Sequence, residues 1–134
     1  MALDIQKREQ EGIAILDLKG RLVVGDASLL REKVSEEAAS GKINVILNLA
    51  DVDYIDSTGL GTMVICFTSL QKAGGALKLC NLNRRNIELL LLTKLSTIIE
   101  LFGAEQEAIN SFFPEREIKR FDILSFVQQH KEAE

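Results

Sequence analysis

The 134-residue sequence is poor in the side chains that many enzymes use at their active sites. It contains one histidine, His130, near the C-terminus, and two cysteines, Cys66 and Cys80, each inside an apolar run that predicts a buried thiol. Zinc sites need clustered cysteine and histidine, and nucleophilic catalysis needs a paired base. Glycine-rich phosphate loops are also missing. The sequence therefore predicts a protein that is not an enzyme and that binds no metal and no cofactor.

An excess of basic residues is also lacking, because 16 Lys and Arg stand against 20 Asp and Glu, for a net charge of −4. Nucleic-acid binding needs a basic patch, and the Arg84–Arg85 pair is the nearest feature to one. No apolar run approaches the roughly 20 residues of a membrane helix, and residues 1–5 do not resemble a signal peptide. We expect a cytoplasmic protein with no nucleic-acid partner and no membrane insertion.

What the sequence does contain is an alternation of strand-like and helix-like segments, which predicts an α/β sheet with right-handed crossovers. Residues 10–12 predict a hairpin turn, and Asp26 is the expected N-cap of the first helix. A polar connection is expected over residues 51–56. Strands are expected at residues 3–9, 13–19, 22–24, 43–49, 76–80 and 98–102, and helices at 26–40, 57–74, 84–93 and 105–111.

Pro114 marks a change in composition near the C-terminus. The chain beyond it is first charged and then amphipathic, with Phe121, Leu124 and Val127 on one expected helix face. We predict one domain at residues 1–113 and a C-terminal extension at 114–134, made of a short helix and a disordered end. The helix either docks on the domain or offers a surface to a partner or to a second copy in a homodimer.

Residues 48–61 combine a buried strand, an acidic connection and a helix that begins at a hydroxyl residue. Ser57 can cap that helix by accepting hydrogen bonds from amides in its first turn. Gly59 and Gly61 cost helix stability, on the order of 1 kcal/mol each relative to alanine. That cost is explained if the backbone of another molecule approaches the first turn closely.

Two interpretations of Ser57 follow from the residues alone. It is either only a helix cap or a phosphorylation switch, because a phosphate would add about −1.5 to −2 charges. The amides and the dipole of the helix N-terminus would tolerate that charge. Asp53, Asp56 and an acidic partner surface would repel it. The switch would then block docking without unfolding the domain.

The segment Asp56-Ser-Thr-Gly-Leu-Gly61 resembles the signature of the STAS domain, a family of bacterial anti-sigma factor antagonists that also includes cytoplasmic tails of sulphate transporters. Four further segments resemble family motifs in the expected order over residues 3–112. They are Gly-Arg-Leu at 20–22, Gly-Gly-Ala-Leu-Lys-Leu at 74–79, Leu-Leu-Thr-Lys-Leu at 91–95 and Glu-Gln-Glu-Ala at 105–108.

The resemblance implies a STAS-like mixed sheet of four to five strands packed against helices. It also implies partner switching in transcription regulation: the unphosphorylated form binds an anti-sigma factor that is also a serine kinase, and a phosphatase restores binding after phosphorylation. By position Ser57 is the phosphoacceptor, with Thr58 as the second choice. The implied docking surface contains Asp26, Asp53, Asp56, Ser57, Thr58, Gly59 and Gly61.

The sequence departs from the family pattern at two positions. Val23 stands where the family commonly has an aspartate, and Asp26 is a candidate substitute for it; Lys94 replaces a common glycine. Two alternative functions stay open. One is a STAS subunit of a membrane transport complex, in which Ser57 need not be phosphorylated. The other is a module that binds a nucleotide or a lipid at the helix N-terminus.

Overall fold

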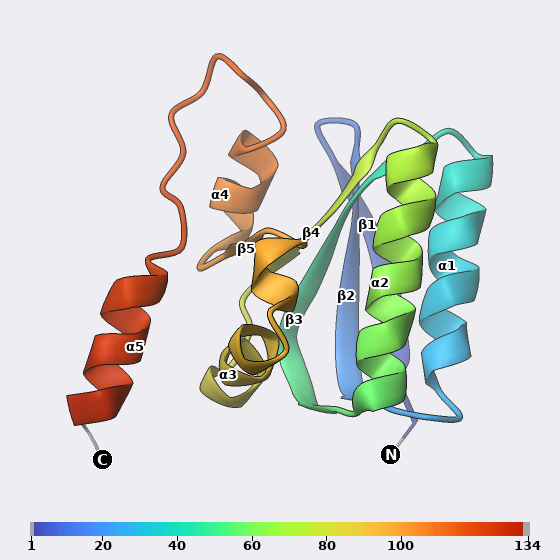
Figure 1. The fold of residues 1–134 in the computed structure, drawn as a ribbon. Helices are drawn as coiled ribbons and strands as arrows, with labels where there is room; N and C mark the ends of the chain where they lie inside the picture. The colour runs from blue at the N-terminus through green and yellow to red at the C-terminus, as the bar shows by residue number, and fades with distance from the viewer. Residues whose placement is uncertain (1, 133–134) are drawn as a thin grey trace.

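A five-stranded mixed sheet lies at the centre of the computed structural model, which describes residues 2–132 (Figure 1). The strand order is β1-β2-β3-β4-β5. The first two strands form an antiparallel hairpin, and every other neighbouring pair is parallel. The strands are β1 (Asp4–Gln10), β2 (Ile13–Leu22), β3 (Asn44–Ile55), β4 (Ala76–Cys80) and β5 (Leu101–Phe102). The predicted mixed α/β sheet is confirmed.

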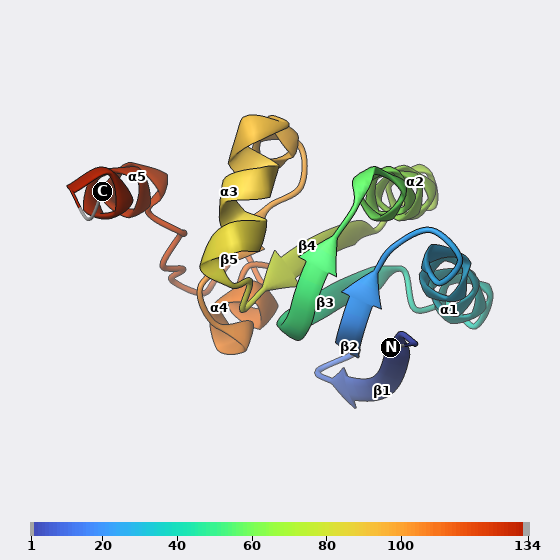
Figure 2. The same ribbon diagram turned by 90° about the horizontal axis from the view of Figure 1, so that it is seen from below.

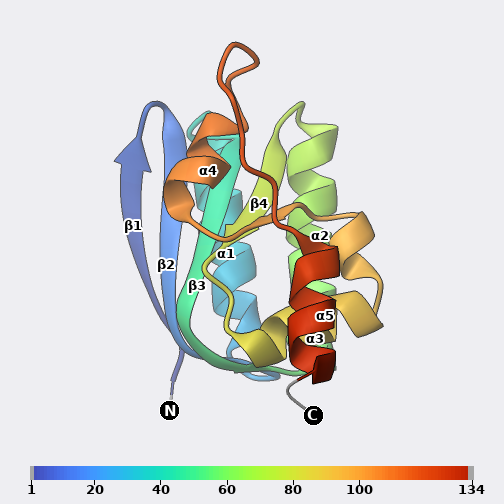
Figure 3. The same ribbon diagram turned by 90° about the vertical axis from the view of Figure 1, so that its left-hand side faces the viewer.

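Helices cover both faces of the sheet. Figure 2 shows α1 (Ala27–Ala39) and α2 (Ser57–Lys72) together on one face, and Figure 3 shows α4 (Glu105–Asn110) across the other. The helix α3 (Arg84–Leu92) and the short 3-10 helix η1 (Leu95–Thr97) follow β4, and α5 (Ile123–Glu132) ends the described chain. No helix among the described residues is both long enough and apolar enough to cross a membrane.

Two hydrophobic clusters follow from the two-residue period of the strands. Leu16, Leu47 and Leu79 face the cluster beneath α1 and α2. Their neighbours Ile15 and Ile46 face the cluster beneath α4. Because β2 and β3 are covered on both faces in their central parts, residues 13–16 and 45–47 are apolar at every position instead of alternating with polar residues.

The strands differ from the prediction at three places. β2 runs without a break to Leu22, so no separate strand exists at 22–24. β3 extends to Ile55 through the expected polar connection, because Val52 and Ile55 are buried and pair with Gly20 and Leu22 of β2. The expected strand 98–102 shortens to β5, which η1 precedes. Long-range pairing with β2 therefore places Asp56 and Ser57 directly after the end of β3.

The C-terminal segment returns to the domain through a few side chains. Phe121 packs against the hydrophobic cluster beneath α1 and α2, which is the larger of the two and is called the main cluster below. Arg120 pairs with Glu100 at 2.7 Å. The Leu124 side chain is 82% exposed and Val127 is also exposed, so neither packs closely on the domain, and a partner for this face stays a prediction. The division at residues 113 and 114 stays a prediction.

Candidate functional site at the start of helix α2

Asp56 joins two segments at the edge of the sheet where the parallel strands end. One carboxylate oxygen accepts a hydrogen bond from the Gly59 amide at 2.8 Å, and the other accepts from the Val24 amide at 3.0 Å. The Asp56 amide donates to the Leu22 carbonyl at 3.2 Å. The loop after β2 and the first turn of α2 are therefore held together by one side chain.

The N-cap of α2 is Asp56 and not Ser57, which corrects the expected capping role of the serine. Asp56 has extended backbone angles, whereas Ser57 is the first helical residue. Aspartate and serine are similarly good caps, so the local sequence does not choose between them. The buried end of β3 at Ile55 sets the position of the turn. Ser57 is thereby left with an exposed side chain.

The electrostatics of the Asp56 carboxylate follow from these contacts. The amides of Val24, Gly59 and Thr58 donate to it and hold its pKa below the usual range, with Val24 as the largest cause. Asp56 is therefore ionised at neutral pH and places a fixed negative charge beside Ser57.

The two glycines of the first turn differ in whether the surrounding structure leaves room for a side chain. A Cβ on Gly59 would lie 2.1 Å from the Leu22 carbonyl oxygen, so this glycine is required by a contact within the protein. The expectation that Gly59 makes room for another molecule is therefore wrong. A Cβ on Gly61 would meet no atom within 4 Å, and Gly61 is exposed.

The remaining predicted site residues lie near the same edge of the sheet. Asp53 and Thr58 are exposed, on β3 and in the first turn of α2. Asp26 is half-buried and is the N-cap residue of α1, as expected, but its side chain makes no capping hydrogen bond. The Val23 carbonyl accepts from the amides of Asp26 and Ala27 instead. Asp26 belongs to the same loop as Val24, which the Asp56 contact brings to α2.

Sequence reasoning missed a cluster of three side chains at this edge. The guanidinium carbon of Arg85 lies 4.3 Å from the centre of the Tyr54 ring, and that of Arg21 lies 5.8 Å from it. Arg21 and Tyr54 are neighbours in the β2–β3 register, and Arg85 comes from α3. No local pattern connects these positions, although the Arg84–Arg85 pair was a partial signal.

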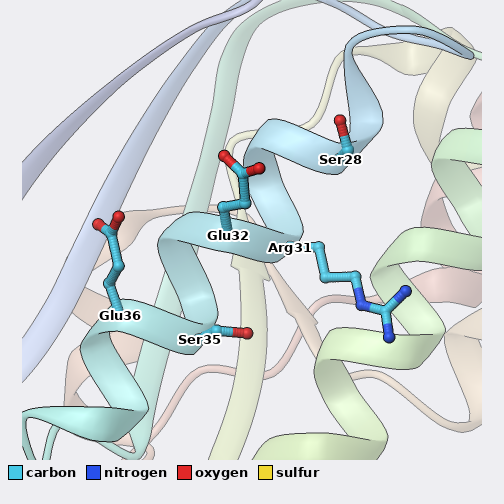
Figure 4. Close-up of a pocket in the computed structure, with 5 residues that line it drawn as sticks. All are labelled: Ser28, Arg31, Glu32, Ser35 and Glu36. Carbon is cyan, nitrogen blue, oxygen red and sulfur yellow. The ribbon is translucent and has the colours of Figure 1, made fainter.

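Two hollows on the described surface are lined by helix residues and do not include Ser57. One of about 440 Å³ follows the outer side of α1 between Ser28 and Glu36, where Figure 4 shows Arg31 extending toward α2. A smaller one of about 190 Å³ lies between α1 and α2 and includes Ile65 and Cys66. Figure 4 shows the five side chains around the first hollow pointing in different directions, and the second is lined by both polar and apolar residues. We assign no ligand to them.

The cysteines are buried, as predicted. Burial raises the pKa of the Cys66 thiol to about 11 and that of the Cys80 thiol to about 12, so both are protonated at neutral pH. Among the side chains that the structure describes, those of residues 2–129, no group of three His, Cys, Asp or Glu has an arrangement that could hold a metal ion.

Comparisons with known proteins agree with this architecture. The anti-sigma-B factor antagonist of Bacillus subtilis is 38% identical over 109 residues, which cover 81% of this chain and 99% of that protein. The crystal structure of the protein TM1081 from Thermotoga maritima is 28% identical, with a TM-score of 0.76 over 80% of this chain and 92% of that one. SpoIIAA from Bacillus in its phosphorylated form has the same fold, with 21% identity and a TM-score of 0.63 over 81% of this chain and 99% of that one. The family model of the STAS domain matches residues 4–108, and the chain therefore belongs to the STAS domain family.

Proposed function

We propose that this protein is an anti-sigma factor antagonist whose binding is controlled by phosphorylation of Ser57. Its partner in this proposal is an anti-sigma factor that is also a serine kinase, and a phosphatase reverses the modification. The similarity to the Bacillus subtilis antagonist supports the class of function. The observation that carries the role of Ser57 is its exposed side chain in the first turn of α2. The protein then acts by binding and not by catalysis.

The surroundings of Ser57 suit a switch that changes charge without changing the fold. The Asp56 side chain already accepts from Gly59, and the extended strand end behind it is fixed by pairing with β2. A phosphate on Ser57 would project from an exposed position, so the buried core beneath it would not need to move. We therefore expect phosphorylation to alter docking and to leave the free energy of unfolding nearly unchanged.

The proposed docking surface combines Ser57 and Thr58 with the exposed Asp53 and Gly61, beside the loop that contains Asp26. Asp56 and Gly59 act beneath it as positioning residues, because their polar and backbone atoms are engaged within the protein. A phosphoserine would then place about −1.5 to −2 charges next to Asp53 and Asp56. An acidic or apolar partner surface would dock poorly against that concentration of charge.

The test uses the purified anti-sigma factor kinase encoded in the same genome, with ATP and this protein. Mass spectrometry of the peptide should place one phosphate on Ser57. Isothermal titration calorimetry should then show that Ser57→Ala binds the kinase with the affinity of wild type. Ser57→Asp should bind at least about tenfold more weakly, because like charges that face each other across an interface lower the affinity by at least that factor.

Thr58→Ala is the matched control, because it removes a neighbouring exposed hydroxyl. It should accept the phosphate and bind the kinase like wild type. A phosphate on Thr58, or equal affinities of Ser57→Asp and wild type, would overturn the proposed role of Ser57.

A further inference from the structure

The cluster of Arg21, Tyr54 and Arg85 has an unusual charge arrangement for this acidic protein. Both guanidinium groups approach the ring of Tyr54, at 5.8 Å and 4.3 Å from its centre. Arg21 and Arg85 are exposed, and Tyr54 is half-buried. An aromatic ring attracts a cation through its negatively charged face. It therefore orients two positive charges in one place without neutralising either.

Most other arginines of the chain are neutralised by acidic side chains. Arg8, Arg84, Arg116 and Arg120 each pair with an aspartate or a glutamate. Among the described side chains of residues 2–129, Arg21, Arg31 and Arg85 have no such partner. Two of these three unpaired arginines meet at Tyr54. Their acceptors must come from solvent or from another molecule.

The position of the cluster connects it with the edge that carries Ser57. Tyr54 is the second-last residue of β3, directly before Ile55. Arg85 lies at the start of α3, which follows β4. The parallel strands β2, β3 and β4 all end at this edge, so the segments that follow them gather there (Figure 1). A protein that docks at Ser57 through an interface of standard size would therefore also cover the cluster.

We propose that Arg21, Tyr54 and Arg85 form a binding site for a carboxylate on an acidic segment of the partner protein. A guanidinium presents two parallel N–H donors that match the two oxygens of a carboxylate. The net charge of −4 disfavours nucleic acid, whose many phosphates need a wider basic surface. An acidic side chain of a protein needs only the local pair. The identity of that protein as an anti-sigma factor rests on the function proposed above.

The site would also strengthen the effect of Ser57 phosphorylation. An acidic segment seated on the two arginines would lie near the start of α2, where the new phosphate is placed. The phosphate would repel that segment and would compete for the same guanidinium groups. Both effects weaken docking, which agrees in sign with the proposed switch.

The first test addresses the chemistry without any partner protein. Hexaglutamate is titrated into the isotopically labelled protein at low salt, and the side-chain Nε–H signals of the arginines and the ring signals of Tyr54 are followed by NMR. The signals of Arg21, Arg85 and Tyr54 should shift, and those of Arg31 should not. Shifts spread evenly over all basic residues would overturn the site. Shifts with inorganic phosphate but none with hexaglutamate would overturn the carboxylate assignment.

The second test uses the anti-sigma factor kinase with Arg21→Gln, Arg85→Gln and the double variant. We expect each single change to weaken binding about threefold to tenfold and to reduce its dependence on salt. Arg31→Gln is the matched control, since it removes the same charge from an unpaired arginine on α1 (Figure 4) and should bind as wild type. Circular dichroism spectra should match for all four proteins.

The two proposals fail in different ways in this experiment. If the arginine variants bind like wild type while Ser57→Asp loses binding, the carboxylate site is wrong and the Ser57 switch stands. If the double variant loses binding while Ser57→Asp does not, the switch is wrong and the carboxylate site stands.

Discussion

The two ends of this domain are held by different kinds of contact. At the start of α2, the Asp56 carboxylate, the Val24 and Gly59 amides and the Leu22 carbonyl meet at hydrogen-bond or van der Waals distance. On the α4 side, charged side chains join the elements: Arg8 of β1 pairs with Asp17 of β2 and with Glu105 of α4.

The difference suggests a division of tasks. Backbone contacts with fixed directions keep the proposed binding edge in one geometry, so a modification there can change charge alone. Exposed ion pairs between flexible side chains fix the position of α4 less tightly, and salt weakens them. We therefore expect substitutions of Asp56 and Gly59, which make these contacts, to cost stability, and substitutions of the ion-paired residues on the α4 side to be mild.

The largest expected effect is that of Gly59→Ala. The new methyl group would meet the Leu22 carbonyl oxygen at 2.1 Å, so either β2 or α2 must shift. We expect a loss of about 3 kcal/mol in the free energy of unfolding, measured by urea denaturation. Gly61→Ala is the matched control in the same turn, where the methyl group meets nothing within 4 Å. It should stabilise the protein by about 0.5–1 kcal/mol. Equal effects of the two changes would contradict the close packing of Gly59.

A smaller effect is expected for Asp56→Asn, and it depends on pH. The native amides lower the pKa of Asp56 below its unfolded value of about 3.9. The carboxylate therefore stabilises the fold above that value, and this contribution is lost as the pH falls through the native pKa. The stability difference between wild type and Asp56→Asn should be largest near pH 7 and should shrink below about pH 4. A difference that stays constant from pH 7 to pH 3 would contradict this role.

Arg8→Gln should have a milder effect on the α4 side. The Arg8 side chain is partly exposed and pairs with Asp17 and Glu105, so we expect a loss of about 1 kcal/mol or less. The loss should shrink in 1 M salt, where charges are screened within about 3 Å. Arg84→Gln removes an ordinary pair within α3 and provides the control for a lost charge. A loss larger than that of Gly59→Ala would reverse the comparison of the two ends.

The smallest effect is expected for Leu124→Gln on α5. The Leu124 side chain is 82% exposed, so its replacement should change the free energy of unfolding by less than about 0.5 kcal/mol. Phe121→Ala is the contrasting change, because Phe121 packs against the main cluster and should lose stability measurably. Thermal unfolding of the two variants would show whether the tail is held by Phe121.

Much of the architecture could be predicted because it depends on local patterns. The apolar run of residues 43–49 predicts a strand covered on both faces, residues 76–80 predict another buried strand, and residues 13–19 predict the second strand of a hairpin. The residues Asp56–Gly61 indicated the STAS family, which the comparisons confirm, and the buried state of Cys66 also followed from its apolar neighbours. Hydrophobic period and short motifs are properties of neighbouring residues, so the sequence by itself determined them.

The tertiary structure decided the features that depend on residues distant in sequence. Pairing with β2 extended β3 to Ile55 and thereby made Asp56 the cap of α2. The Leu22 carbonyl leaves no room for a side chain at position 59, so a glycine is required there. The sheet register brought Arg21 to Tyr54 and Arg85. These outcomes depend on distances that exist only after the strands have paired. Local propensity treats Asp56 and Ser57 as equal caps and Gly59 and Gly61 as equal glycines, whereas packing makes each pair unequal.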